Sequence, residues 1–323
     1  MRTFEFKTFT DSYPVLIQTL INEGKSVSPR GMDTLEISPV SITIKEPLKN
    51  VIFSDSRKLN YGFMLGELGW ILQKSNDANH IAHYNKNWLN YSDDGVTLNG
   101  AYGQRIFDYH GINQFEEAFH QLQKDPNSRQ ATIVLFDPTR DYQPTKDKPC
   151  TNLIRFSIRE NKLNMIVFMR SNDIMFGYPY DVFNFSTLQS IMANKLNLNV
   201  GTYTHIVDSF HLYKEQLSWA NDIMREEQPI IYGPLEIERK FDSNDIQTFL
   251  NVEQTTRKMI GLIDIETIEK MLLDIDSEYW RSNAAFLALY NYRKMHYSQN
   301  TLDKFKKLIT NELVFILDRY GEL

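Results

Sequence analysis

The stretch 170–185 places an arginine, a serine and two aspartates where a strand gives way to a helix. It follows the apolar run 163–169, which predicts a strand, and precedes the run 186–196, which predicts a helix. Arg170 and Ser171 stand at the end of that strand. A guanidinium fork and a hydroxyl match the geometry of phosphate, so this pair predicts an oxyanion site.

The same stretch combines acidic residues with turn-forming residues. Gly177 and Pro179 predict a turn, because glycine tolerates unusual backbone angles and proline presets one of them. Such a turn would hold Asp173 and Asp181 near one pocket. The stretch as a whole therefore predicts a site for a phosphorylated ligand.

Cys150 is the only cysteine of the chain and follows a proline. A single cysteine excludes a disulfide within the chain and is typical of a reducing compartment. Its thiol is free for chemistry, although an isolated cysteine is more often an inert core residue.

The composition is typical of a globular protein with a large core. Hydrophobic residues make up 42% and aromatic residues 13% of the 323 residues, which argues against wholesale disorder. The formal net charge of −6 argues against a dedicated duplex-DNA binder. Neither a secretory signal nor a run long enough to span a bilayer is visible, so we expect a cytoplasmic protein.

Helices and strands alternate irregularly, which favours an α/β fold with a mixed sheet over a doubly wound parallel one. We expect helices at 13–21, 61–72, 113–123, 186–196 and from about 214 to 226. We expect strands at 34–44, 130–136, 154–158, 163–168, 205–213 and 230–237. The helix 61–72 is apolar on most faces and carries one carboxylate, Glu67, in its middle.

The character of the chain changes after about Lys240. Helical periodicity recurs at 245–260, 265–275, 278–296 and 302–320, and the last of these has the clearest apolar stripe. We therefore expect a catalytic domain at 1–240 and a helical C-terminal extension at 241–323. The stripes of the extension fit core packing, a dimer contact or a partner site.

From about residue 26 to residue 240 the chain resembles the thymidylate synthase family. Three blocks carry the resemblance together: the Pro-Cys pair at Cys150, the Arg-Ser-x-Asp…Gly-x-Pro block from Arg170, and the Asp-Ser-Phe-His-Leu-Tyr block that ends at Tyr213. It implies a mixed-sheet α/β sandwich and a homodimer whose subunits complete each other's sites. It also implies a pyrimidine nucleoside monophosphate substrate and methylenetetrahydrofolate as co-substrate, without a metal.

The resemblance makes Cys150 the catalytic nucleophile. A thiolate that adds to carbon 6 of a pyrimidine turns carbon 5 into an enolate-like nucleophile toward the one-carbon unit. Nearby arginines would help by lowering the pKa of the thiol. Glu67 would organise proton transfer around the base, since an unpaired charge in an apolar helix is costly.

The resemblance also assigns the binding residues. Arg30, Arg170 and Ser171 would bind the 5′-phosphate, and Arg129 would reach it from the partner subunit. Family members usually carry a second arginine where this chain has Gln130, so the phosphate site is expected to be built differently.

The sugar and the folate complete the set of expected contacts. His211 and Tyr213 would hydrogen-bond the sugar 3′-hydroxyl, because residues two apart share a strand face. The residues assigned to the folate side of the cavity are Trp88, Tyr102, Asp173 and Gly177.

Asp181 is the most informative departure from the family. Thymidylate synthases place asparagine at the matching position, where the amide accepts from the uracil ring N–H and donates to the 4-oxo group. An ionised carboxylate cannot donate. It suits cytosine when one proton is shared with ring nitrogen 3, so Asp181 resembles the deoxycytidylate hydroxymethylase branch.

Two further departures bear on the product. Thr151 follows the cysteine where thymidylate synthases have histidine, and helical sequence stands where the family has a short tail over the folate. A site open to water favours a hydroxymethyl over a methyl product. We expect hydroxymethyl transfer to dCMP or CMP; the alternatives are methylation of dUMP or of a cytosine nucleotide, and a non-catalytic nucleotide-binding homologue.

Overall fold

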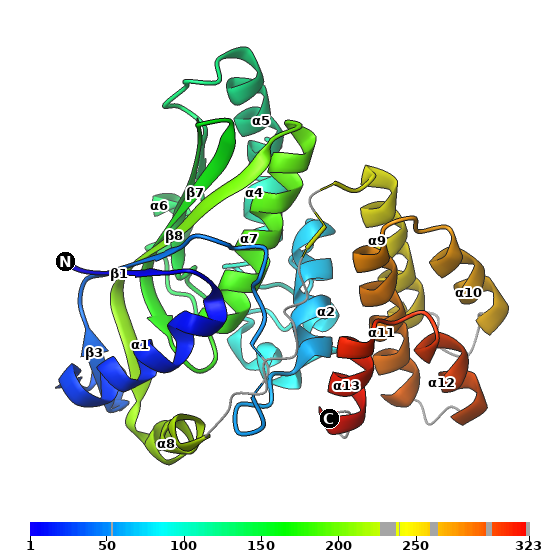
Figure 1. Ribbon diagram of the computed structural model, residues 1–323. Helices are drawn as coiled ribbons and strands as arrows, with labels where there is room; N and C mark the ends of the chain where they lie inside the picture. Colours follow the sequence, from blue (N-terminus) through cyan, green and yellow to red (C-terminus); the bar gives the residue numbers. More distant parts are fainter. Residues whose placement is uncertain (53, 227–236, 239, 259–263, 295–298, 321–323) are drawn as a thin grey trace.

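The computed structural model describes residues 1–52, 54–226, 237–238, 240–258, 264–294 and 299–320 (Figure 1). The strands are β1 (Arg2–Phe6), β2 (Lys25–Val27), β3 (Thr34–Ile37), β4 (Val40–Ile44), β5 (Thr132–Val134), β6 (Thr151–Arg159), β7 (Lys162–Asp173) and β8 (Asn199–Tyr213). They form a mixed sheet in the order β1-β4-β8-β7-β6-β5. In addition, β3 pairs with β8, and β2 pairs with β3. The pairs β1–β4 and β7–β8 are parallel and the others antiparallel, so the predicted mixed α/β sheet is confirmed.

Helices cover the sheet and build the rest of the molecule. The α-helices are α1 (Phe9–Glu23), α2 (Tyr61–Leu72), α3 (Ala78–Ala82), α4 (Tyr102–Phe107), α5 (Gln114–Lys124), α6 (Pro138–Asp141), α7 (Tyr178–Lys195), α8 (Leu217–Arg225), α9 (Ser243–Lys258), α10 (Ile265–Leu273), α11 (Glu278–Lys294), α12 (Gln299–Lys306) and α13 (Asn311–Tyr320). Short 3₁₀ turns are η1 (Pro29–Gly31), η2 (Lys86–Tyr91) and η3 (Lys214–Gln216). None of the described helices is long and apolar enough to cross a membrane.

The central layer of the molecule is α7, which packs on β7 and β8 with one side and on α2 with the other (Figure 1). Almost every residue of α7 is buried, because the sheet covers one side of it and α2 the other. On the opposite side of the sheet the side chains are only half buried, among them Ile166 and Phe168 of β7.

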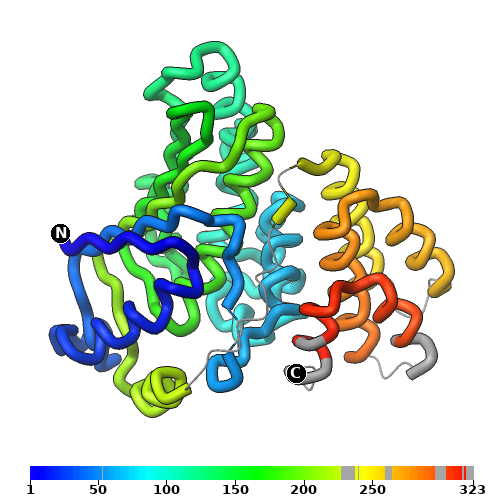
Figure 2. The backbone as a smooth tube through the Cα atoms, viewed as in Figure 1, coloured from blue at the N-terminus to red at the C-terminus, as the bar shows by residue number. Residues whose placement is uncertain are grey.

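The C-terminal helices pack against the outer side of α2 (Figure 2). The Tyr61 hydroxyl donates to Asn283 Oδ1 of α11 at 2.7 Å, and the Tyr61 and Phe286 rings meet edge to face at 5.1 Å. Gly62 allows this close approach, since a Cβ there would stand 2.3 Å from the ring of Tyr290. The extension thereby supports the helix that carries Glu67.

A buried ionic cluster lies where α9 meets α2 and α3. Glu253 is fully buried and pairs with Arg257 at 2.6 Å and with His80 at 3.1 Å. It also accepts from the Tyr84 hydroxyl at 2.8 Å and from the Gln73 amide at 2.5 Å. These donors hold the pKa of Glu253 down at about 2 despite its burial.

Two predicted elements are divided in the structure. The expected strand 34–44 is interrupted at Ser38-Pro39, because proline lacks the N–H that a ladder needs, and β3 and β4 then pair with different parts of β8. The expected helix 302–320 is broken before Thr310, whose carbonyl starts α13 and whose N–H donates to Ser282 Oγ at 2.8 Å.

The start of α7 also differs from the prediction. The helix begins at Tyr178 rather than at 186, because Pro179 occupies its first turn, where the missing N–H costs nothing. The expected Gly-Pro turn is therefore the first turn of a helix, and Asp181 lies within it. The expected strand 230–237 lies outside the described residues except for its last residue, Ile237.

Candidate functional site

Cys150 lies at the end of a loop that Arg170 holds in place. The Cys150 carbonyl accepts from the Arg170 backbone N–H at 2.9 Å. The guanidinium of the same arginine donates from Nε to the Pro149 carbonyl at 3.1 Å and from Nη2 to the Lys148 carbonyl at 3.0 Å. Arg170 thus fixes the backbone that presents the thiol, and its Nη1 group, which donates to none of the described residues, can meet an anion.

Burial governs the ionisation of the Cys150 thiol in the absence of substrate. Burial raises the pKa of Cys150, and the carboxylates of Asp181 and Asp147 raise it further. Arg170 and Arg30 act in the opposite direction, as expected from the sequence, but they do not offset the burial. The thiol is consequently neutral at rest.

Asp181 lies in the first turn of α7, close enough to the Cys150 thiol for its charge to raise the pKa of that thiol. Its Oδ2 accepts a hydrogen bond of 2.6 Å from Nδ2 of Asn172. Burial raises the pKa of Asp181 to about 7, although this hydrogen bond lowers it. Near neutral pH a large fraction of Asp181 therefore carries a proton and can donate a hydrogen bond.

Glu67 faces the same space from α2. Asn184 of α7 donates from Nδ2 to Glu67 Oε2 at 2.7 Å. Burial, and then the charge of Asp181, raise the pKa of Glu67 to about 8. Two carboxyl groups with raised pKa values beside a thiol are typical of a site that moves protons.

Tyr102 joins Cys150 to this group from α4. The hydroxyl of Tyr102 accepts from the Thr151 N–H at 3.2 Å, directly after the cysteine. Burial and the charges of Asp181 and Cys150 raise its pKa, so the phenol keeps its proton. Its ring packs 5.7 Å from that of Phe185. Tyr102 therefore lies beside Cys150, and its contact with the base or the folate stays a prediction.

His211 and Tyr213 lie together at the end of β8. Their rings meet edge to face at 5.1 Å, and His211 Nδ1 lies 3.2 Å from the Ser209 carbonyl. Arg30 lies on η1 with a left-handed backbone (φ 54°) and is exposed. Burial raises the pKa of both Tyr213 and Cys150, and the charge of Arg30 opposes this rise in each case, which places this cation on the same side of the molecule as the thiol.

Asp173 and Gly177 shape the turn between β7 and α7. The Asp173 carboxylate accepts from the backbone N–H groups of Met175 at 2.8 Å and Phe176 at 3.1 Å. Gly177 is required by packing, because a Cβ there would stand 2.7 Å from Nδ2 of Asn172. The two residues fix the approach of the chain to Asp181, and their contact with folate stays a prediction.

Three further predicted site residues lie at different places relative to Cys150 and the two carboxyl groups. Trp88 lies on η2, partly buried between Trp70 at 6.0 Å and Tyr91 at 5.9 Å. Ser171 pairs with Ser209 in the β7–β8 ladder, next to Arg170. Arg129 is exposed on the loop after α5, and no contact joins it to the thiol in the described part of this single chain. A role for Arg129 would require a second subunit.

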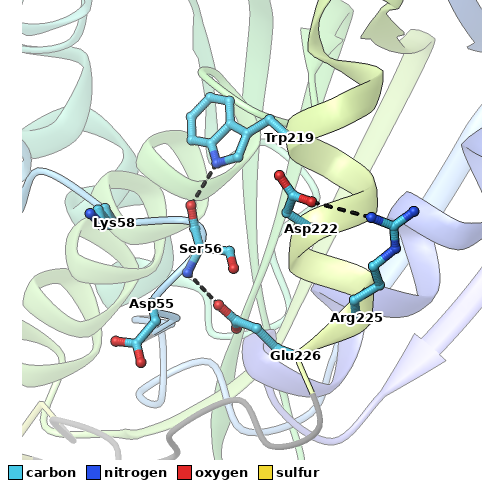
Figure 3. Close-up of a pocket in the computed structure, with 7 residues that line it drawn as sticks. All are labelled: Asp55, Ser56, Lys58, Trp219, Asp222, Arg225 and Glu226. Carbon is cyan, nitrogen blue, oxygen red and sulfur yellow. Dashed lines mark hydrogen bonds and ion pairs between the residues drawn. The ribbon is translucent and has the colours of Figure 1, made fainter.

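A separate hollow of about 580 Å³ opens between α8 and the loop after β4 (Figure 3). It is lined by Asp55, Ser56, Lys58, Trp219, Asp222, Arg225 and Glu226. The Trp219 indole donates to the Ser56 carbonyl at 2.6 Å, and its ring lies 5.6 Å from that of Phe176. The hollow thus borders the Asp173 turn but contains none of the predicted site residues.

Comparison with known proteins identifies the family. The family model described as thymidylate synthase matches residues 11–268. The chain belongs to the thymidylate synthase family. A deoxyuridylate hydroxymethyltransferase of Bacillus phage SP01 is 32% identical over 292 residues, which cover 82% of this chain and 75% of that protein.

Other members of the thymidylate synthase family are similar over shorter lengths. A deoxyuridylate hydroxymethyltransferase of Delftia phage PhiW-14 is 32% identical over 202 residues, covering 58% of this chain and 56% of that protein. A thymidylate synthase of Bacillus licheniformis is 26% identical over 237 residues, covering 68% and 85%. The chain is accordingly an enzyme of pyrimidine C5 one-carbon transfer, a class that uses methylenetetrahydrofolate as co-substrate.

Membership of the thymidylate synthase family extends beyond the expected boundary. The matched region ends at residue 268 and so includes α9 and the start of α10, whereas the sequence resemblance ends near residue 240. The expected division at residue 240 stays a prediction.

Asn172 and Asn184 were not among the expected site residues. Asn172 is the variable position of the Arg-Ser-x-Asp block, and Asn184 lies one helical turn beyond Asp181. The i, i+3 spacing from Asp181 was the available signal for Asn184, since such residues share a helix face.

Proposed function

We propose that this enzyme transfers a hydroxymethyl group to carbon 5 of a deoxypyrimidine nucleoside monophosphate. The observation that carries the proposal is the convergence of Cys150 with two protonatable carboxyl groups, Asp181 and Glu67, in one partly buried site. The Cys150 thiol gives up its proton as its sulfur adds to ring carbon 6, and the electron pair displaced from the ring double bond forms the bond from carbon 5 to the one-carbon unit. Carbon 5 then loses its proton and the folate departs, water adds to the resulting methylene group, and the thiolate leaves carbon 6. Methylenetetrahydrofolate supplies the one-carbon unit.

The remaining residues bind and orient the nucleotide. Arg170, Ser171 and Arg30 carry the guanidinium and hydroxyl groups suited to the 5′-phosphate. Hydrogen bonds between the arginines and this anion would be charge-assisted and therefore strong. The His211 and Tyr213 side chains lie together where the sugar hydroxyl is expected. Trp88, Tyr102, Asp173 and Gly177 form the proposed folate side of the cavity.

A place for water near Glu67 supports the hydroxymethyl product. Asn184 holds Glu67 with its amide N–H, while its own Oδ1 is buried and accepts no hydrogen bond from the described residues. A buried acceptor of this kind is suited to an ordered water. The printed names of the phage relatives, deoxyuridylate hydroxymethyltransferase, point to the same product.

The base is proposed to be uracil first and cytosine second. A protonated Asp181 has one donor and one acceptor, like the asparagine of thymidylate synthases, so the carboxyl group no longer argues against uracil. The relatives' names then favour dUMP. Cytosine is the second candidate, because an ionised Asp181 can share one proton with ring nitrogen 3 and accept from the exocyclic amine.

A homodimer is proposed to complete the phosphate site. Along β7 the half-buried residues Ile166 and Phe168 alternate with buried ones. They therefore lie on the opposite face of the sheet from the buried residues, and a second copy would cover that half-buried face. Arg129 would then reach the partner's nucleotide. We expect Ile166→Glu to shift the mass measured by light scattering from dimer to monomer and to abolish turnover; a monomeric wild-type enzyme with full activity would contradict the proposed dimer.

The product assay tests the proposal directly. Purified enzyme is incubated with methylenetetrahydrofolate and an equimolar mixture of dUMP, dCMP and CMP, and the products are identified by mass spectrometry. We expect a 5-hydroxymethyl deoxynucleotide without stoichiometric dihydrofolate. Formation of a methylated product with one dihydrofolate per turnover would instead establish methylation. Nucleotide binding without release of tritium from carbon 5 would establish the non-catalytic alternative.

A further inference from the structure

A chain of three buried side chains runs inward from Asp181. Asn172 donates to Asp181 at 2.6 Å, and its Oδ1 lies 3.1 Å from Nε2 of His205. On the other side of the imidazole, Nδ1 lies 2.7 Å from the hydroxyl of Tyr203. Tyr203 and His205 are fully buried, and Asn172 is 4% exposed. The family chemistry described above uses none of these three residues.

The direction of the hydrogen bonds in this chain follows from its inner end. Burial keeps the Tyr203 phenol protonated, and within the described residues its hydroxyl is bonded to His205 alone. The phenol therefore donates to Nδ1. Burial lowers the pKa of His205 to about 3, so the imidazole is neutral and carries its one proton on Nε2.

This tautomer of His205 fixes the orientation of the Asn172 side-chain amide. The Nε2–H group donates to the amide oxygen, so the amide N–H₂ group must face Asp181. A reversed amide would place its oxygen against the carboxyl oxygen and its N–H₂ group against the Nε2–H of His205. The contact with His205 would set donor against donor whatever the protonation state of Asp181, so the amide has a single stable orientation.

We propose that Asn172 is a positioning residue that determines which pyrimidine the enzyme accepts, by fixing one oxygen of Asp181 as an acceptor. This inference rests on the proposed function and deepens it. With Oδ2 occupied by the Asn172 donor, the carboxyl proton resides on Oδ1. The carboxyl group then presents its donor and its acceptor in one order only.

The order matters because uracil and cytosine present opposite patterns. At ring positions 3 and 4 uracil has a donor and then an acceptor, and cytosine has an acceptor and then a donor. A carboxylic acid that could carry its proton on either oxygen would pair with both bases. Fixing the proton on one oxygen makes the acid selective, since the other base would meet donor against donor and acceptor against acceptor.

Removing the Asn172 donor tests this inference. For wild type and Asn172→Leu we would measure Kd for dUMP and for dCMP by calorimetry, and kcat/KM for both in the folate-dependent assay. We expect the ratio between the two nucleotides to fall at least tenfold toward one, with the weaker nucleotide gaining affinity. The near-isosteric Asn172→Asp variant, which replaces the donor by an acceptor, is expected to reduce or invert the ratio.

The matched control is Gln189→Leu. Gln189 is a fully buried amide of α7 that donates to the Leu163 carbonyl at 2.9 Å and the Thr202 carbonyl at 3.0 Å, away from Asp181. It should cost stability and leave the nucleotide ratio unchanged. If Asn172→Leu does not fold, Asn172→Asp and Tyr203→Phe provide the test, because the latter frees the His205 tautomer and should also lower the ratio.

The outcomes separate this inference from the proposed function. A folded Asn172 variant whose ratio stays within twofold of wild type would overturn the inference while wild-type turnover still supports hydroxymethyl transfer. Failure of the wild type to form a C5 product would overturn the proposed function. The binding ratios would still decide the role of Asn172, since calorimetry needs no turnover.

Discussion

Asn184 donates a hydrogen bond to Glu67 at 2.7 Å and thereby joins α7 to α2 inside the site. The helix that positions Asp181 therefore also orients the second carboxyl group. Because a donor stabilises the ionised carboxylate, this bond keeps the pKa of Glu67 lower than burial alone would allow.

Asn184→Leu should raise the pKa of Glu67 above about 8 and disorder its carboxyl group. We expect kcat to fall roughly 10- to 100-fold, in the range of a mispositioned acid or base. The measurement is the pH profile of kcat, whose alkaline limb should move to higher pH. An unchanged profile with a lowered Tm would indicate a purely structural role.

Arg170→Gln should slow the reaction of Cys150 with iodoacetamide. The substitution removes the charge that lowers the pKa of the thiol and loosens the loop held through the carbonyls of Lys148 and Pro149. The alkylation rate at pH 8 is the measurement. Arg159→Gln, at the exposed end of the same hairpin, is the control and should react at the wild-type rate.

Cys150→Ala should abolish turnover and spare nucleotide binding. Without the thiol no adduct forms at carbon 6, so release of tritium from carbon 5 should fall to background. Calorimetry with dUMP should show a Kd within a few-fold of wild type. Residual tritium release above a few per cent would mean that another group attacks the ring.

Asp181→Asn should stabilise the free enzyme at alkaline pH and exclude cytosine. The folded-state pKa of about 7 is above the ordinary aspartate value, so wild type loses stability as the pH rises between about 4 and 7. The variant should gain on the order of 4 kcal/mol in the free energy of unfolding at pH 8 and nothing near pH 4. Urea unfolding at both pH values measures this gain.

The same variant has a catalytic consequence. An asparagine has the pattern of thymidylate synthases, so any use of dCMP should disappear while dUMP is retained. Turnover of dCMP by Asp181→Asn at the wild-type rate would show that Asp181 does not contact the base.

Glu253→Gln should destabilise the chain by on the order of 3 kcal/mol at pH 7, because it leaves Arg257 buried without its counter-charge. The pKa of Glu253 is depressed to about 2, so the wild-type advantage should be complete above about pH 4.5 and vanish as the pH falls toward 2. Urea unfolding across this range measures it. Glu116→Gln, in a surface pair with Lys195, should cost less than about 1 kcal/mol.

The sequence predicts those helices and strands in which one hydrophobic pattern continues from the first residue to the last. The helix 61–72 has the predicted bounds, because its apolar residues continue until the polar pair Gln73-Lys74. The strands predicted at 154–158 and 163–168 are confirmed as parts of β6 and β7, which pair as a hairpin whose turn residues Glu160 and Asn161 both lie in the left-handed region. Local chemistry is sufficient in both cases.

Long-range contacts explain what the sequence does not predict. Asn172 is an unremarkable residue until β8 brings His205 beside it, 33 positions later in the chain. For the Cys150 thiol, the sequence indicates the right charged neighbours but the wrong net change in pKa. Its arginine neighbours are as expected, but their effect depends on a burial that no local pattern reveals.

The packing of α11 on α2 has a consequence for the order of synthesis. Gly62 and Tyr61 emerge from the ribosome early, whereas Phe286 and Tyr290, which cover them, are made more than two hundred residues later. The helix that presents Glu67 therefore lacks its contact with α11 until more than two hundred further residues have been made. A chain interrupted before residue 278 would contain Cys150 and Arg170 but not α11, which packs on the helix of Glu67.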